Sequence, residues 1–117
     1  MIRVLLAVES AAVCQRLQDL LGQDPEIDIV GRVTDPVDVL LAVGDVQADV
    51  VIQTWPESGR LPGVCSHLLA EYPHLLVIGV PPRQDRMFAC RQRIARTRVP
   101  TMECLTAEIH RWVPVAK

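Results

Sequence analysis

The chain has 117 residues, half of them hydrophobic, and a formal net charge of −2 at pH 7. This length suits a single domain over residues 1–117 whose apolar core needs neither disulfides nor metal. The slightly negative charge argues against a general nucleic-acid-binding protein, and no apolar run reaches the roughly 18 residues of a membrane-spanning helix.

The four cysteines form no Cys-x-x-Cys pair and share no repeated spacing; they are Cys14, Cys65, Cys90 and Cys104. This pattern argues against a disulfide framework and against a structural zinc site. The apolar run at residues 2–8 is too short for a signal-peptide core and contains Arg3. We therefore expect a cytoplasmic protein with buried thiols and no metal or other cofactor.

Four apolar runs are predicted to be strands. Three are almost continuously apolar, which is typical of strands buried on both faces, and the other begins with alternating residues, which is typical of an edge strand. The buried strands are predicted at residues 1–8, 48–56 and 75–80, and the edge strand at 26–33.

Helices are predicted between these strands from apolar residues spaced three or four apart. The first begins at Ser10 and ends at Gly22. The second begins at Asp35, which can cap free N–H groups, has Pro36 at its first position, and ends at Gly44.

The second half of the chain is less regular. A third helix is predicted over residues 63–72, after a loop rich in Pro and Gly. Residues 83–100 fit either a short helix or a β-hairpin, and we favour the pair of strands. The last helix is predicted to begin at Thr101, a capping residue, and to end before Pro114.

Strands and helices that alternate in this order predict an α/β fold: a three-layer, flavodoxin-like domain with a five-stranded parallel sheet in the order 2-1-3-4-5. Residues 83–100 are its atypical segment. In such sheets functional residues gather beyond the carboxyl ends of the strands. The first candidates are therefore Glu9, Thr54 and Trp55.

Five segments together resemble the receiver domain of bacterial response regulators: IRVLLAVES, LLGQDPEIDIVGRVTDPVDVLLAV, ADVVIQ, LLAEYPHLLVIGV and TMECLTAEI. The resemblance covers residues 1–80 and the last helix, and it fails between Arg83 and Pro100. It implies a domain that accepts a phosphoryl group from a histidine kinase on an aspartate at the end of the third strand. That aspartate and an acidic pair after the first strand would hold Mg²⁺.

The positions that would carry this chemistry are largely replaced. By the resemblance, the acidic pair falls on Val8 and Glu9, the acceptor aspartate on Thr54, the hydroxyl-bearing switch residue on Gly79, and the fifth-strand lysine within one residue of Arg98. One carboxylate of three remains, whereas Mg²⁺ requires several oxygen ligands, and a threonine hydroxyl is a poor acceptor for phosphohistidine. We expect a degenerate pseudo-receiver without phosphotransfer, in which Glu9 serves as a helix-start carboxylate.

Charge is distributed unevenly along the chain. Eight acidic residues lie between Leu17 and Val50 against Arg32 alone, and six arginines lie between residues 83 and 98 against Asp85. In the predicted strand order these regions fall at opposite edges of the sheet. We call the six arginines the arginine edge; they are Arg83, Arg86, Arg91, Arg93, Arg96 and Arg98.

The arginine edge is the candidate interface, because guanidinium groups suit stacked and bidentate contacts. Trp55, beside the degenerate phosphorylation site, is a further candidate as an aromatic anchor. An arginine run can equally be a solvated face, and Trp55 can equally pack under the loop that follows it. Opposite charge at opposite edges also allows head-to-tail self-association.

We predict a signalling module, not an enzyme, that binds a protein partner or itself through the arginine edge, without phosphorylation and without a membrane. Two alternatives remain open. The arginine edge could bind nucleic acid, although few aromatic residues are available for stacking. The crevice at Glu9 and Thr54 could instead hold a small ligand.

Overall fold

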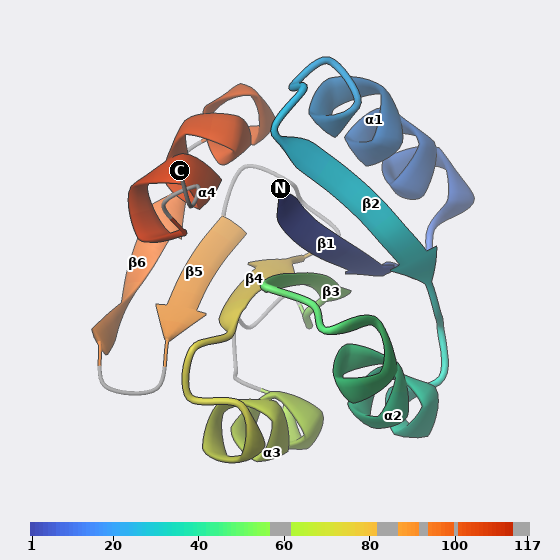
Figure 1. Cartoon of the computed structure of the whole chain (residues 1–117), viewed down its shortest axis with the longest axis vertical. Helices are drawn as coiled ribbons and strands as arrows, with labels where there is room; N and C mark the ends of the chain where they lie inside the picture. Colours follow the sequence, from blue (N-terminus) through green and yellow to red (C-terminus); the bar gives the residue numbers. More distant parts are fainter. Residues whose placement is uncertain (57–61, 82–86, 92–93, 100, 114–117) are drawn as a thin grey trace.

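The computed structural model describes residues 1–56, 62–81, 87–91, 94–99 and 101–113, without the side chains of Pro36 and residues 94–97. Its six strands form one sheet in the order β2-β1-β3-β4-β5-β6 (Figure 1). They are β1 Ile2–Ala7, β2 Ile27–Arg32, β3 Val50–Thr54, β4 Leu76–Val80, β5 Met87–Arg91 and β6 Ile94–Val99. Strands β1 to β4 are mutually parallel, which confirms the predicted order 2-1-3-4 with β2 at the edge.

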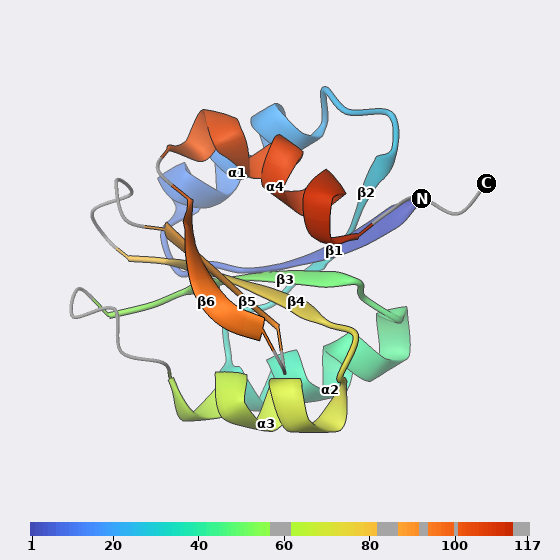
Figure 2. The same ribbon diagram turned by 90° about the vertical axis from the view of Figure 1, so that its left-hand side faces the viewer.

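Helices cover both faces of the sheet. Helices α1 (Ala11–Leu21) and α4 (Leu105–Trp112), the latter preceded by a 3₁₀ turn (Met102–Cys104), lie on one face, and α2 (Pro36–Val46) and α3 (Gly63–Glu71) lie on the other (Figure 2). Strands β1, β3 and β4 are almost fully buried, as their apolar composition predicts. The three-layer α/β fold is confirmed.

The segment predicted as atypical contains the β-hairpin, and the sheet is therefore mixed and six-stranded where we expected five parallel strands. Strand β5 is antiparallel to both β4 and β6. Only residues 81–86 connect β4 to β5, which is too few for the helical crossover that a parallel neighbour requires. The alternation in β5 follows from this position: Met87 and Ala89 pack toward α4, and Phe88 and Cys90 pack toward α3.

Two helix starts form as predicted, because each cap is local in the sequence. The Ser10 side chain accepts a hydrogen bond from the Val13 N–H at 3.3 Å. The Asp35 side chain accepts one from the Val37 N–H at 2.8 Å, and Pro36 stands in the first turn. Both caps satisfy N–H groups that the helix itself leaves unpaired.

The prediction that Gly44 ends the second helix was wrong. Helix α2 continues to Val46 and is followed by Gln47, whose backbone is left-handed with a φ of 52°. Gly44 serves packing instead, because a Cβ at this position would lie 2.7 Å from the Tyr72 hydroxyl oxygen. Its small size allows Tyr72 to approach α2.

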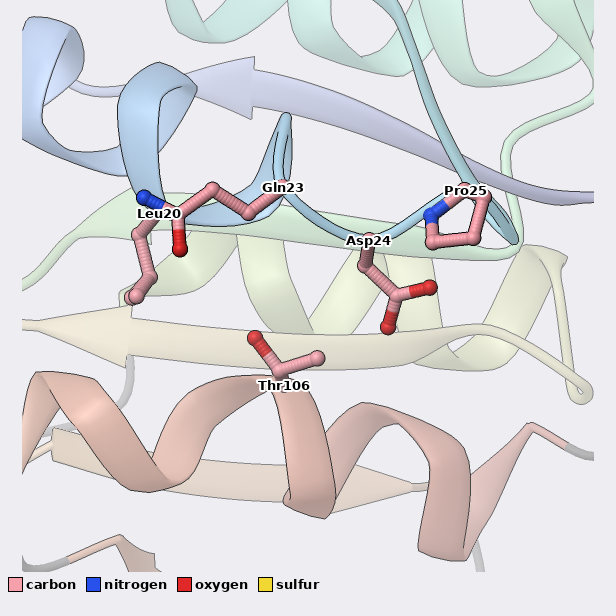
Figure 3. Close-up of a pocket in the computed structure, with 5 residues that line it drawn as sticks. All are labelled: Leu20, Gln23, Asp24, Pro25 and Thr106. Atoms are coloured by element: carbon pink, nitrogen blue, oxygen red, sulfur yellow. The ribbon is translucent and has the colours of Figure 1, made fainter.

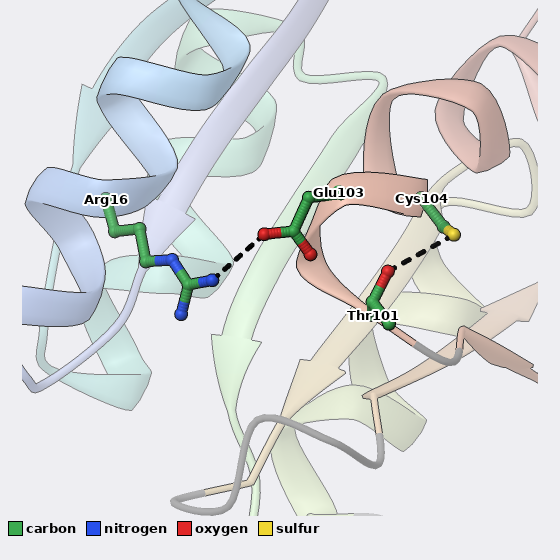
Figure 4. Close-up of polar contacts among 4 residues, drawn as sticks. All are labelled: Arg16, Thr101, Glu103 and Cys104. Atoms are coloured by element: carbon green, nitrogen blue, oxygen red, sulfur yellow. Dashed lines mark hydrogen bonds and ion pairs between the residues drawn. The ribbon is translucent and has the colours of Figure 1, made fainter.

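Two polar contacts tie helix α4 and the 3₁₀ turn before it to helix α1 and the loop after α1. His110 Nε2 lies 2.6 Å from Asp24 Oδ2, beside a hollow of about 360 Å³ that Asp24 lines with Leu20 and Thr106 (Figure 3). Arg16 Nη2 lies 3.1 Å from Glu103 Oε1, and both side chains are more than half exposed (Figure 4). The His110–Asp24 contact is the better shielded and should hold α4 more firmly.

We expect the substitution Asp24→Asn to lower the free energy of unfolding by about 1 kcal/mol at neutral pH. A hydrogen bond from the Glu26 N–H, and then the contact with His110, hold the pKa of Asp24 below its ordinary value of 3.8. A lowered pKa stabilises the fold above the ordinary value, and this contribution is lost as the pH falls through the folded-state pKa. Urea unfolding should therefore show a difference between wild type and variant that shrinks in acid.

The substitution Asp28→Asn, on the exposed face of β2, is the control and should change stability little. An Asp24→Asn variant as stable as wild type at neutral pH would contradict the role of this contact.

Among the described residues, no helix combines the length and the apolarity that crossing a bilayer requires.

Candidate functional site

The candidate site lies where β1, β3 and β4 end. Parallel pairing aligns these ends, so that Gln53 lies between Ala7 and Gly79, and Thr54 lies beside Val80. Of the positions taken from the receiver pattern, Val8, Glu9 and Thr54 come together around one small hollow. Gly79 is not among the lining residues, but it directly precedes Val80, which is.

At the position of the acceptor aspartate, the Thr54 hydroxyl is engaged in a hydrogen bond with a backbone N–H group. The Glu9 N–H donates to Thr54 Oγ1 at 3.0 Å and joins the end of β1 to the end of β3. The Glu9 side chain is exposed, whereas Val8 is buried. The hydroxyl therefore contributes to the structure of the crevice, where the receiver pattern would place a reactive carboxylate.

These residues do not fit the magnesium ion that the receiver pattern implies. The hollow between Val8 and Thr54 measures about 160 Å³, and its walls are mostly apolar, with Val13, Val80 and Pro81 contributing. Mg²⁺ prefers several carboxylate or carbonyl oxygens, and Glu9 supplies one carboxylate. Within the described ranges, no group of three or more His, Cys, Asp or Glu side chains is placed to hold a metal.

Trp55 is an interior residue and is not available as an exposed anchor. Its side chain is 1% exposed, and its ring stacks on Phe88 with centroids 5.8 Å apart. The indole lies directly over Gly79, where a Cβ atom would come within 2.0 Å of Trp55 Cδ2. The second interpretation, in which Trp55 packs inside, is the one that agrees with its burial.

Beneath Trp55, Gln53 and Cys65 form a buried polar pair. The Cys65 thiol donates to Gln53 Oε1 at 2.9 Å. Burial raises the pKa of Cys65 to about 12, although a side-chain hydrogen bond with Trp55 opposes the shift. Sequence reasoning missed Gln53; the available signal was a glutamine in an otherwise apolar strand.

We expect only one of the four thiols to react readily with iodoacetamide in the folded protein. Cys104 is exposed, whereas Cys14, Cys65 and Cys90 are buried. Because the thiolate is the nucleophile, the raised pKa of Cys65 slows its alkylation further. Mass spectrometry after brief labelling should find one adduct in the native state and four in urea.

The variant Cys104→Ser is the control for this experiment, and it should carry no adduct until the protein unfolds. Rapid labelling of Cys65 in the native state would show that the Gln53–Cys65 pair is more accessible than the structure indicates.

The arginine edge is described only in part. Arg98 is exposed on β6, and Arg91 donates from Nε and Nη2 to the His74 carbonyl oxygen at 3.2 and 2.9 Å. Arg96 belongs to β6 by its backbone, but its side chain lies outside the described residues. The others, Arg83, Arg86 and Arg93, also lie outside the described residues.

The structure does not bring Arg98 to the candidate site. Strands β4 and β5 separate β6 from β3, and three strand spacings of about 4.8 Å place them roughly 14 Å apart. A side chain on β6 is therefore remote from Thr54. The expected order 2-1-3-4-5 placed the strand of Arg98 directly beside the fourth strand, whereas β5 lies between β4 and β6 in the structure.

No protein-family model matches the chain. It is 30% identical over 114 residues to a protein-glutamate methylesterase/protein-glutamine glutaminase of group 3 operon from Rhodopseudomonas palustris. A protein-glutamate methylesterase/protein-glutamine glutaminase from Hydrogenovibrio crunogenus is 44% identical over 50 residues. These matches cover 89% and 43% of the chain but only 31% and 13% of the relatives, so the chain spans less than a third of their length.

Two solved structures share the fold. The isolated REC domain of RcsB from Salmonella enterica serovar Typhimurium, determined with phosphomimetic BeF3−, matches with a TM-score of 0.58 and 18% identity, over 68% of this chain and 61% of that one. The response regulator domain of CheB from Thermotoga maritima matches with a TM-score of 0.57 and 24% identity, over 69% and 60%. At these identities the likeness concerns the fold alone.

Proposed function

The chain is a receiver-like domain, and from this premise we propose that it works as a pseudo-receiver: a signalling module that binds a protein partner or a second copy of itself without being phosphorylated. The observation that carries the proposal is the position of Trp55 over Gly79. By the resemblance, a hydroxyl at this position would follow the phosphoryl group. Here glycine offers no hydroxyl, and an indole fills the space that a side chain would need.

The contact between Glu9 and Thr54 supports the same proposal. The Thr54 hydroxyl already accepts the Glu9 N–H at 3.0 Å, and its pKa is far above that of a carboxylate. Phosphorylation as a switch requires both an acceptor and an element that moves. Thr54 does not supply a suitable acceptor, and Gly79 does not supply a side chain that could move.

We place the partner surface on the arginine edge. Because Arg91 is engaged with the His74 carbonyl oxygen, the exposed Arg98 is the better candidate for contact with a partner. Guanidinium groups bind carboxylates in a bidentate manner, which favours an acidic partner surface.

A second copy of the chain offers such an acidic surface. Helix α2 exposes Val37 and Leu41, each 64% accessible, beside the exposed carboxylates of Asp38 and Asp45. Strands β2 and β6 stand at opposite edges of the sheet, so an arginine edge docked on an acidic side would give head-to-tail contacts. Such an assembly should weaken as salt is added.

The proposed role as a binding module also concerns the extent of the domain, its location and its lack of catalysis. We propose that residues 1–117 act as one domain in the cytoplasm and catalyse no reaction themselves. The activities in the relatives' names are not carried to this chain, because it spans less than a third of their length.

The absence of phosphorylation is tested with Mg²⁺ and beryllofluoride, an analogue of the phosphoryl group. Backbone amide spectra of the wild-type chain should be unchanged at Glu9, Thr54 and Gly79 up to millimolar concentrations. A saturable shift centred on these three residues would overturn the pseudo-receiver assignment.

The interface is tested by affinity capture from the native cytoplasm with three baits: wild type, an Arg96→Glu/Arg98→Glu variant, and the control Arg32→Glu, whose arginine is exposed at the opposite edge. We expect a protein recovered with wild type and Arg32→Glu and lost with the double variant, regardless of nuclease treatment. Equal recovery by all baits would reject the arginine edge as the interface. Loss of the captured protein on nuclease treatment would favour nucleic-acid binding instead.

A further inference from the structure

We infer that the hollow on the α2 and α3 side of the Glu9–Thr54 hydrogen bond is a binding site for a small zwitterion of the amino-acid class. This hollow measures about 440 Å³, which lies within the usual range for small-ligand sites. Residues at the ends of β1 and β3 line it together with Val39 of α2 and Val64 of α3. The site is separate from the arginine edge and does not depend on the proposed protein partner.

Gln53 is the main indication of a ligand. It is 7% exposed and is the buried polar side chain of the described core. Its amide has one partner among the described residues, the Cys65 thiol, and its other polar atom is open to solvent at the hollow that Gln53 lines. Water can complete the hydrogen bonds of this amide, and a ligand that displaces the water must replace them, so Gln53 favours a ligand with a polar group at this position.

Helix α3 adds positive potential at the same hollow. Its N-cap is Pro62, and no side chain caps the first turn, unlike α2 with its Asp35 cap. The first N–H groups of a helix have no partner within it, and they favour negative charge. Pro62 and Val64 line the hollow, which places this helix end against the same space as Gln53.

Glu9 supplies the opposite charge. Glu9 is exposed and is one of the residues that line the hollow, together with the hydroxyl-bearing Thr34 and Thr54. An anion alone would be repelled by Glu9, and a cation alone would leave Gln53 and the start of α3 without a partner. A zwitterion can place its carboxylate toward Gln53 and the start of α3 and its ammonium group toward Glu9. The two valines suit a short apolar portion of the ligand between these groups.

The test titrates each of the twenty common L-amino acids into the wild-type chain and records amide shifts and melting temperature. We expect at least one of them to raise the melting temperature and to shift the amides of Glu9, Gln53 and Val64. The variants Gln53→Leu and Glu9→Gln should each weaken binding tenfold or more, since each removes a hydrogen bond that involves a charged group. Glu71→Gln, exposed at the far end of α3, should bind as wild type does.

Three outcomes would overturn the inference. One is the absence of any shift at these amides with all twenty amino acids at millimolar concentration. Another is undiminished binding to Gln53→Leu. A third is binding of acetate as tight as that of the amino acids, which would leave no role for Glu9.

Stability distinguishes a binding role for Gln53 from a structural one. If Gln53 serves a ligand, Gln53→Leu should unfold at the same or a higher denaturant concentration than wild type, because the apolar leucine side chain offsets the one lost hydrogen bond to the Cys65 thiol. A loss of stability would show that the glutamine serves the fold and would count against the inference. The amide shifts of the wild-type chain decide the question independently of any variant.

Discussion

The substitution Gly79→Ala will lower the free energy of unfolding by about 3 kcal/mol. A Cβ atom at this position would lie 2.0 Å from Trp55 Cδ2, far inside van der Waals contact. The indole has little room to retreat, because it is 1% exposed and stacks on Phe88. Denaturant unfolding of the variant, followed by tryptophan fluorescence and circular dichroism, measures the change.

Two further variants show whether the clash is the cause. Gly63→Ala introduces the same methyl group at a helix start with no atom within 4 Å of the new Cβ, and it should leave stability unchanged or slightly raised. In a Trp55→Leu background, Gly79→Ala should cost much less than in wild type, because contacting residues are not additive. Equal costs in both backgrounds would show that Trp55 and Gly79 are not coupled.

The second large effect is expected from Val8→Asp, which restores the carboxylate that the receiver pattern places there. Val8 is 2% exposed in a mostly apolar hollow, and a charge introduced at such a site without a partner costs about 3 kcal/mol or more. The loss should diminish as the pH falls, because burial raises the pKa of the new carboxyl group and protonation relieves the cost.

The neutral variant Val8→Asn separates charge from polarity, and it should be less destabilised than Val8→Asp at neutral pH. Millimolar Mg²⁺ should not restore the stability of Val8→Asp, since Glu9 is the one other carboxylate among the described residues that line this hollow. Recovery of stability with Mg²⁺ would mean that the crevice still holds the ion and that the site is less altered than its residues indicate.

Much of the candidate site could be predicted from the sequence because parallel strands align their ends. Val8, Glu9 and Thr54 belong to strands whose apolar runs are clear, so their meeting at one edge follows from strand order alone. Gln53 was missed for a physical reason. Alternation assigns it to one face of β3, but whether that face meets a hollow or a packed helix depends on α2 and α3.

The roles of two glycines and a tryptophan likewise depend on contacts between distant segments. Gly44 resembles a helix end by its residue type, yet it lies within α2, where its small size leaves room for Tyr72. Gly79 resembles a lost switch residue, and its pairing with Trp55 emerges only when β3 and β4 lie side by side.

The sequence by itself determined what is local: the apolar runs that become strands and the caps at Ser10 and Asp35. It also indicated the order 2-1-3-4, because strands and helices that alternate in this way are typical of a flavodoxin-like fold. Tertiary structure decided the direction of β5, the burial of Trp55, the distance of Arg98 from Thr54 and the hollow over Gln53. The division has one physical cause. Caps and periodicity depend on neighbours in the chain, whereas space, clash and hydrogen-bond satisfaction depend on residues that only the fold brings together.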